Sequence, residues 1–142
     1  MRWDSVRTSF LIRPLPGNEM HALIIEDEWL VAILIEHVLK DCGFDSFSFA
    51  SSGKAAIAAA VSRRPDLVTA DVRLEPGCGI EAVRSLRKDQ SIPVIFITAS
   101  GASTREQISE HPVINKPFSQ ETLTYAVAAS LRKSVTIING PL

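Results

Sequence analysis

The sequence has almost no excess charge of either sign, which limits the partners that it can attract electrostatically. Its 15 lysines and arginines face 16 aspartates and glutamates, for a net charge of -1. Proteins that bind nucleic acid or anionic membranes through their surface charge usually carry a clear positive excess. We therefore expect neither nucleic acid nor a membrane among the partners of this protein.

Long hydrophobic runs are also missing. A helix that spans a membrane needs a stretch of about 18 or more apolar residues, and no part of this sequence approaches that length. The apolar stretch within residues 9–12 is too short for the core of a signal peptide. These absences predict a cytoplasmic protein.

Cysteine is scarce, with only Cys42 and Cys78 in the chain. Their spacing matches no metal-binding pattern. Cys42 precedes Gly43 at an expected helix end, and Cys78 stands between two glycines in an expected loop. We interpret both as free thiols rather than as a disulfide or a redox pair.

The chain does have enough apolar material for one domain. It has 142 residues, of which 46% are hydrophobic and 22% charged, a composition typical of a single globular core. We expect this domain at residues 20–133. Residues 1–19 contain a Pro- and Gly-rich segment and are expected to be a flexible tail, unless the start codon has been assigned too early. Residues 134–142 are expected to form a C-terminal tail, in which Val135–Ile138 could add a short strand.

Within the domain, segments typical of strands alternate with segments typical of helices. The expected strands are His21–Asp27, Phe44–Ala50, Leu67–Val72, Pro93–Thr98 and Val113–Asn115. The expected helices are Trp29–Lys40, Ala55–Ser62, Ile80–Lys88, Ser103–Glu110 and Glu121–Arg132. Because parallel strands need crossover helices, this alternation predicts an α/β fold with helices on both faces of a sheet. We adopt the flavodoxin-like, doubly wound five-stranded parallel sheet with strand order 2-1-3-4-5.

Polar residues follow the apolar strands at the ends where such sheets bind ligands. Glu26 and Asp27 follow the first strand, Asp71 follows the third, Thr98 ends the fourth, and Lys116 follows the fifth. Each has an ordinary structural interpretation by itself, as a turn residue, a helix cap or a solvated lysine. Their joint occurrence at one sheet edge favours a shared site.

Carboxylates, a hydroxyl and an ammonium in one crevice suit a divalent cation and a phosphoryl group. Clustered carboxylates repel one another, and Mg2+ with oxygen ligands removes that cost. Asp71 could then act as a nucleophile that forms an aspartyl phosphate. Lys116, the Thr98 hydroxyl and the backbone N–H of Ala99 could bind the transferred oxygens.

These residues closely resemble the signature of two-component response regulator receiver domains. Glu26-Asp27 match the acidic pair of that family, Asp71 its phosphoacceptor, Thr98-Ala99 its switch hydroxyl and small neighbour, and Lys116-Pro117-Phe118 its Lys-Pro-Phe motif. Gly79 falls where the family has a glycine. The resemblance covers about residues 20–133.

The resemblance implies a Mg2+-dependent switch that is phosphorylated on Asp71 by a histidine kinase or a histidine phosphotransfer protein. It implies metal contacts from Asp27, Asp71 and the backbone carbonyl of Arg73, with Glu26 beside the ion as a ligand, directly or through water. It also implies a cis bond between Lys116 and Pro117, which the sequence permits. Output would go to a downstream protein target, by contact or by passing on phosphoryl groups, since no effector domain fits after residue 132.

Two features depart from the family. The family has an aromatic residue three positions before the lysine, where this chain has Val113. The segment between Ala99 and Lys116 is also shorter than usual. We therefore expect the output to involve rearrangement of the short helix at Ser103–Glu110 and its loops.

Two surfaces are expected to bind partners. On the first helix, Trp29, Ile33 and Ala32 should face outward and form a docking patch, with Leu34, Ile35, Val38 and Leu39 facing the sheet. On the last helix, outward-facing Tyr125 and Ala126 suggest a homodimer.

Two other functions compete with the switch, which would not be an enzyme acting on separate substrates. One is a magnesium-dependent phosphatase or phosphotransferase with an aspartyl intermediate. That class usually has a second aspartate two residues after the nucleophile, where this chain has Arg73. The other is a degenerate interaction domain, which the complete set of acids and lysine disfavours.

Overall fold

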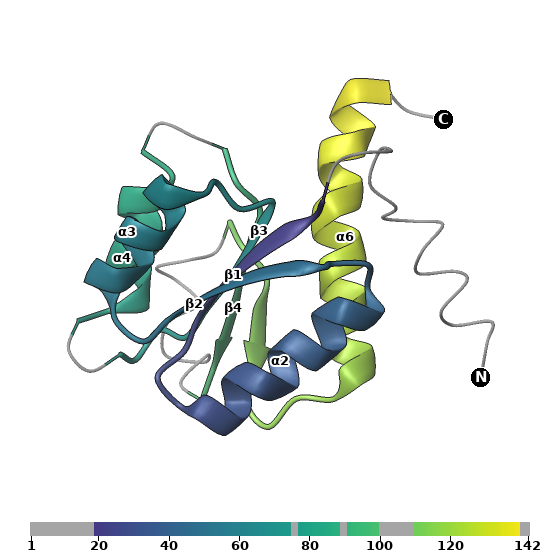
Figure 1. Cartoon of the computed structure of the whole chain (residues 1–142). Helices are drawn as coiled ribbons and strands as arrows, with labels where there is room; N and C mark the ends of the chain where they lie inside the picture. The colour runs from purple at the N-terminus through teal and green to yellow at the C-terminus, as the bar shows by residue number, and fades with distance from the viewer. Residues whose placement is uncertain (1–18, 75–76, 89–90, 100–109, 140–142) are drawn as a thin grey trace.

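The computed structural model describes residues 19–74, 77–88, 91–99 and 110–139, with only the helical backbone for residues 132–139. Within these residues the chain forms a parallel sheet flanked by helices (Figure 1). The elements in chain order are β1 His21–Ile25, α2 Trp29–Asp41, β2 Ser46–Ala50, α3 Gly53–Ser62, β3 Leu67–Ala70, α4 Gly79–Leu86, β4 Val94–Thr98, β5 Val113–Asn115 and α6 Gln120–Asn139.

The sheet has five parallel strands in the order β2-β1-β3-β4-β5, which confirms the predicted topology. β1, β3 and β4 are buried along their whole length. Their near-continuous apolar sequences follow from this, because a central strand between two layers of helices has no solvent face. β2 is an edge strand with partly exposed residues, as its alternating sequence predicts.

Helices cover both faces of the sheet (Figure 1), and a hydrophobic cluster lies on each face. The first lies under α2 and α6 and includes Ile24, Ile35, Ile97 and Leu123. The second lies under α3 and α4 and has Phe96 among its largest fully buried side chains. Both faces are therefore closed, and the polar residues at the strand ends remain at the edge of the sheet.

Apart from the end of the last helix, the boundaries of the described elements agree with the expected ones to within two residues. The Ser52 hydroxyl accepts a hydrogen bond from Ala55 N at 3.1 Å and caps α3, as predicted. Both cysteines are free. The helix expected at Ser103–Glu110 lies almost entirely outside the described residues. None of the helices in the described ranges combines the length and hydrophobicity that a bilayer span requires.

At the C-terminus the structure corrects one expectation. Residues Val135–Ile138 are part of α6 and form no strand, because the helix continues to Asn139. It thereby crosses the domain boundary expected at residue 133. The 135–138 stretch is rich in β-branched residues, and such a short apolar run does not by itself distinguish strand from helix.

The orientation of α2 also differs from expectation. Its buried residues are Ala32, Ile35, Val38 and Leu39. Trp29 and Ile33 face outward as predicted, but Leu34 is 57% exposed and Ala32 only 3%, so both of these assignments were wrong. α2 is apolar around most of its circumference, and periodicity therefore does not determine which side faces the sheet.

On α6 the prediction was half right. Tyr125 is 74% exposed, but Ala126 is buried against the sheet. Adjacent residues of a helix point about 100° apart, so both could not lie at the centre of one outward face. A homodimer through α6 stays a prediction.

Candidate functional site

Asp71 follows β3 directly and is held in place by backbone pairing. Its N–H donates to the carbonyl of Ile25 at 2.9 Å, which extends the pairing of β1 and β3 by one residue. The side chain is only 8% exposed. Its Oδ1 accepts a hydrogen bond from Arg73 N at 3.1 Å, and its Oδ2 accepts one from Lys116 Nζ at 2.8 Å. One oxygen thus contacts the loop after β3, and the other contacts Lys116.

Glu26 and Asp27 follow β1 and meet Asp71, as their positions at neighbouring strand ends predict. The N–H of Glu26 donates to the carbonyl of Ala50 at 2.9 Å, which fixes this residue to β2. One carboxylate oxygen from each of Glu26, Asp27 and Asp71 lies within 4.8 Å of the others. Glu26 and Asp71 are buried, and Asp27 is exposed. The edge of the sheet therefore has three acids around one point.

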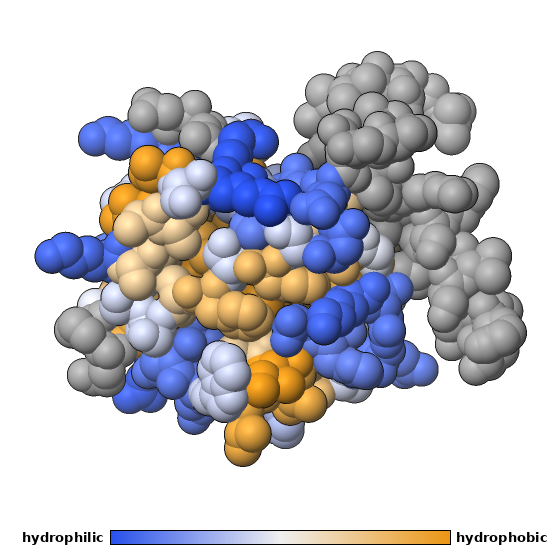
Figure 2. All heavy atoms as spheres, in the orientation of Figure 1, coloured by the Kyte–Doolittle hydropathy of each residue, from blue (hydrophilic) through white to orange (hydrophobic). Residues whose placement is uncertain are grey.

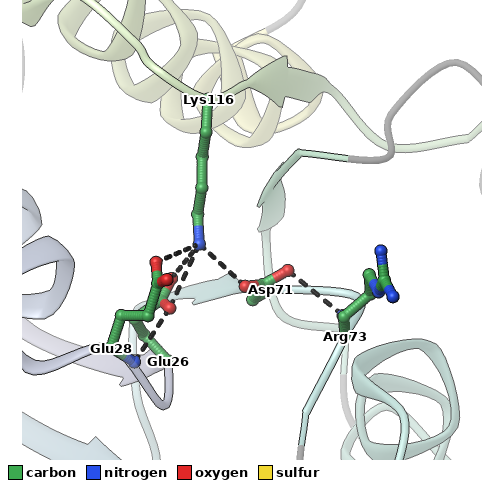
Figure 3. A network of polar contacts seen from close by, with 5 residues as sticks. All are labelled: Glu26, Glu28, Asp71, Arg73 and Lys116. Carbon is green, nitrogen blue, oxygen red and sulfur yellow. Dashed lines mark hydrogen bonds and ion pairs between the residues drawn. The ribbon is translucent and has the colours of Figure 1, made fainter.

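Lys116 enters the site from the end of β5. Its N–H donates to the carbonyl of Thr98 at 3.1 Å, and its bond to Pro117 is cis, as predicted. The ammonium group reaches the carboxylates of the β1–α2 loop on one side and Asp71 on the other (Figure 3). Lys116 therefore connects the strand ends of β1, β3 and β5.

Thr98 and Ala99 lie at the end of β4, next to Lys116. Thr98 is fully buried and is paired in register with Asn115 of β5. Ala99 is exposed. The structure thus brings both residues to the correct edge of the sheet, and the roles expected for the Thr98 hydroxyl and the Ala99 N–H stay predictions.

Arg73 lies in the loop after Asp71. Its guanidinium points away from the acids (Figure 3), and the loop is closed by an isolated antiparallel bridge between Arg73 and Cys78. A metal contact from the Arg73 carbonyl stays a prediction.

The charges of the site are strongly coupled. Burial raises the pKa of Glu26 to about 6, although hydrogen bonds from Lys116 and from the N–H of Glu28 act in the opposite direction. Burial alone would lower the pKa of Lys116, but hydrogen bonds and charge from Asp71 and Glu26 outweigh it and raise that pKa above its usual range. Lys116 is thus a permanent cation in the site.

The residues present fit a hard divalent cation. Glu26 Oε1 is buried and lies 3.1 Å from Lys116 Nζ as an ion pair, but no described residue donates a hydrogen bond to it. A buried carboxylate oxygen without a hydrogen bond is costly. Carboxylate oxygens are also the ligands that Mg2+ prefers. Glu26, Asp27 and Asp71 would hold the ion.

Two residues have roles that the sequence did not reveal. Gly79, noted there only for its position, packs on Asp71: an added Cβ would stand 1.9 Å from the carbonyl oxygen of Asp71. Glu28, for which no motif predicts a role, accepts a hydrogen bond through Oε1 from Lys116 Nζ at 3.3 Å. In the sequence, only the acidic run Glu26–Glu28 indicated that Glu28 could contact Lys116.

Comparison with known proteins agrees with this geometry. The family profile described as the response regulator receiver domain matches residues 22–128, which is most of the chain. The chain belongs to the response regulator receiver domain family. Receiver domains are signalling switches of two-component systems and typically bind Mg2+ at an acidic pocket.

The individual relatives include regulatory proteins. The chain is 30% identical over 136 residues to the probable transcriptional regulatory protein TcrX of Mycobacterium tuberculosis, covering 91% of this chain and 57% of TcrX. The solution structure of the PhyR receiver domain of Erythrobacter litoralis is 31% identical, with a TM-score of 0.71 and coverage of 81% of this chain and 92% of that one. PhyR of Brucella abortus is 27% identical, with a TM-score of 0.76 and coverage of 87% and 53%. The chain thus spans little more than half the length of TcrX and of that PhyR.

Proposed function

We propose that this receiver domain accepts a phosphoryl group on Asp71 from a phosphohistidine donor, with Mg2+, and signals through protein contacts. The observation that carries the proposal is the contact of 2.8 Å between Lys116 Nζ and Asp71 Oδ2 beside a group of three carboxylates. A buried nucleophile, a fixed cation and a potential metal site within one crevice are the parts that phosphoryl transfer requires.

The transfer itself is a displacement at phosphorus. A carboxylate oxygen of Asp71 attacks the phosphorus atom of the donor, and the bond between phosphorus and the donor's imidazole nitrogen breaks. The imidazole, which carries a proton on its other ring nitrogen, keeps the electron pair of the broken bond and leaves as a neutral ring. The product is an aspartyl phosphate, whose phosphoryl group carries about 1.5 to 2 negative charges at pH 7 in place of the single charge of the carboxylate.

Residues of four strand ends share the stabilisation of that charge. Lys116 would contact a phosphoryl oxygen from the side of β5, as a point charge on a flexible stem. The Thr98 hydroxyl and the Ala99 N–H would donate from the end of β4. Mg2+ held by Glu26, Asp27, Asp71 and the Arg73 carbonyl would supply the remaining neutralisation.

The partners follow from the same chemistry. A histidine kinase or a histidine phosphotransfer protein would donate the phosphoryl group, and a downstream protein target would recognise the phosphorylated state. Loops beside Asp71, including the segment after Ala99, would change on phosphorylation.

Intact mass spectrometry after incubation with acetyl phosphate and Mg2+ tests the proposal. We expect one phosphoryl group per chain, its loss in Asp71→Ala, and its loss when Mg2+ is removed by a chelator. Asp66→Ala is a matched control, because Asp66 precedes the same strand at its opposite end. An adduct that persists in Asp71→Ala would contradict the proposal.

The same experiment distinguishes the alternative of a phosphatase or phosphotransferase acting on small substrates. Such an enzyme would consume acetyl phosphate in many turnovers per chain. The side chain two residues after Asp71 is an exposed arginine, which offers no carboxyl group for acid–base catalysis. We therefore expect turnover to remain slow and limited by hydrolysis of the aspartyl phosphate.

A further inference from the structure

Glu28 contacts the site lysine although it belongs to neither the metal group nor the strand ends. Its Oε1 accepts a hydrogen bond from Lys116 Nζ at 3.3 Å, and its own N–H donates to Glu26 Oε2 at 3.1 Å. Its side chain is 64% exposed. Figure 3 shows Glu28 and Glu26 approaching the ammonium from the same side, opposite Asp71.

Helix capping does not explain this residue. Glu28 is the N-cap of α2, yet its side chain makes no capping hydrogen bond to the helix. Asp, Asn, Ser and Thr are the residues that cap well. The side chain of Glu28 is instead turned toward Lys116, so the feature to be explained is that contact.

The three N–H donors of the Lys116 ammonium have three carboxylate partners. They are Asp71 Oδ2 at 2.8 Å, Glu26 Oε2 at 3.1 Å and Glu28 Oε1 at 3.3 Å. An ammonium group has three donors and no more, so a phosphoryl oxygen must displace one of these acceptors. Glu28 lies outside the group of acids that could share a metal ion, so binding of that ion does not require Glu28 to release Lys116.

We propose that Glu28 is a positioning residue that restrains Lys116 in the unphosphorylated state and so weakens the capture of phosphoryl groups. This inference rests on the proposed function of Asp71. In the restrained state Lys116 is neutralised by a carboxylate that takes no part in the transfer. Phosphorylation then requires Lys116 to exchange Glu28 for a phosphoryl oxygen.

The size of the effect follows from the exposure of Glu28. Ion pairs with one exposed partner contribute little because water and salt screen them, so releasing Lys116 should change phosphoryl affinity by about two- to fivefold. Screening also means that the effect should shrink as salt is added.

Affinity for beryllofluoride, a non-covalent mimic of the phosphoryl group, measures this directly in the presence of Mg2+. We expect Glu28→Gln to bind beryllofluoride about two- to fivefold more tightly than the wild type. Glu36→Gln is the matched control, because it removes the same charge from the same helix at a residue paired with Lys40.

Glu28→Asp separates restraint of the lysine from simple repulsion of the anion. Aspartate keeps the charge and caps helices better, but its shorter side chain should not reach Lys116. We expect Glu28→Asp to behave like Glu28→Gln. An affinity equal to that of the wild type would mean that charge alone acts, and would overturn the proposal.

A second readout needs neither metal nor phosphoryl mimic. Hydrogen exchange of the Lys116 ammonium protons, followed by NMR in metal-free protein, should be faster in both Glu28 variants and unchanged in Glu36→Gln. Unchanged exchange in the Glu28 variants would refute the restraint even if beryllofluoride bound more tightly. Failure of the wild type to bind beryllofluoride at all would refute the proposed function itself, and the regulation with it.

Discussion

The backbone of Asp71 lies so close to Gly79 that it occupies the space that a side chain at position 79 would need. A Cβ at position 79 would stand 1.9 Å from the carbonyl oxygen of Asp71 and 2.8 Å from its carbonyl carbon. The N–H of Gly79 also donates to the carbonyl of Val72 at 2.8 Å. The start of α4 is thereby clamped onto the backbone that carries the proposed phosphoacceptor.

We predict that Gly79→Ala destabilises the fold by about 2 kcal/mol or more, because backbone atoms must move to admit the methyl group. The same movement should displace Asp71 and lower the yield of phosphoryl adduct. Chemical denaturation and intact mass measure the two effects.

Gly53→Ala is the control for this substitution. A Cβ at position 53 would meet only the Cβ of Ala82, at 3.4 Å. Alanine also favours helix over glycine by up to about 1 kcal/mol. We expect Gly53→Ala to be neutral or stabilising; equal losses in the two variants would contradict the clamp.

The fold and most of the site could be predicted from the sequence because their signals are local and mutually consistent. Continuous apolar runs mark central strands, and an acid, a hydroxyl or a lysine at their ends marks one edge of the sheet. Glu26, Asp71 and Lys116 do meet there. That meeting depends only on strand order, which the alternation of strands and helices limits to few possibilities.

Other features could not be predicted because they depend on contacts between distant segments. The orientation of α2, which buries Ala32 and exposes Leu34, is decided by packing against α6 and the sheet. The contact of Glu28 with Lys116 joins residues 88 positions apart. The close approach of Gly79 to Asp71 depends on where the fold places two backbone segments. A glycine permits such an approach but does not show which segment it will meet.

A second prediction concerns binding of Mg2+ as a function of pH. Burial raises the pKa of Glu26 to about 6, so this carboxyl group is partly protonated near that pH. A metal ion needs the carboxylate and must displace the proton. Mg2+ affinity should therefore fall as the pH falls through about 6, and at pH 8, where Glu26 is ionised, it should no longer depend on the protonation of this residue.

Calorimetric titration with Mg2+ in buffers of different ionisation enthalpy measures the proton release. We expect a fraction of a proton per Mg2+ near pH 6, almost none at pH 8, and none at either pH in Glu26→Gln. Equal proton release at both pH values would argue against Glu26 as its source.

The opposite end of β1 holds a buried histidine that should make stability depend on pH. The ring nitrogens of His21 are each 2.8 Å from a serine hydroxyl, Nδ1 from Ser46 and Nε2 from Ser48. Burial lowers the pKa of His21 below its ordinary value of 6.5, and the charge of Arg63 lowers it further. A neutral imidazole can satisfy both hydroxyls, with one nitrogen as donor and one as acceptor.

We predict that His21 makes the protein less stable as the pH falls below 6.5. In that range the unfolded chain binds a proton at His21 more readily than the folded chain, and such a difference lowers stability with falling pH. Glu26 acts in the opposite direction, since its raised pKa favours the folded state at low pH. Glu26 contributes equally to the wild type and to His21→Gln. The difference in stability between these two proteins therefore isolates the contribution of His21.

The free energy of unfolding of both proteins, measured from pH 8 to pH 5, tests this prediction. The advantage of the wild type over His21→Gln should be largest above pH 6.5 and should decrease below it. An advantage that grows on acidification would mean that the imidazolium is the favoured form in the folded state.

The last prediction concerns the outward face of α2. Trp29, Leu30, Ile33 and Leu34 are all substantially exposed, and Trp29 contacts Phe49 of β2 with ring centroids 5.9 Å apart. Figure 2 shows hydrophobic surface over α2 and β2 on the face turned to the viewer. Trp29 directly follows Glu28, so this apolar surface begins beside the proposed phosphorylation site. Apolar surface of this kind often marks an interface.

We predict that Trp29→Ala slows phosphotransfer from the cognate kinase or phosphotransfer protein much more than phosphorylation by acetyl phosphate. Docking of a protein donor depends on buried apolar area, and aromatic anchors commonly contribute about 2 kcal/mol or more at such interfaces. A small donor uses only the charged crevice. Tyr125→Ala on α6 is the matched control, since Tyr125 is similarly exposed, at 74%. Equal slowing of both donors by Trp29→Ala would show that Trp29 acts on the crevice itself and not on docking.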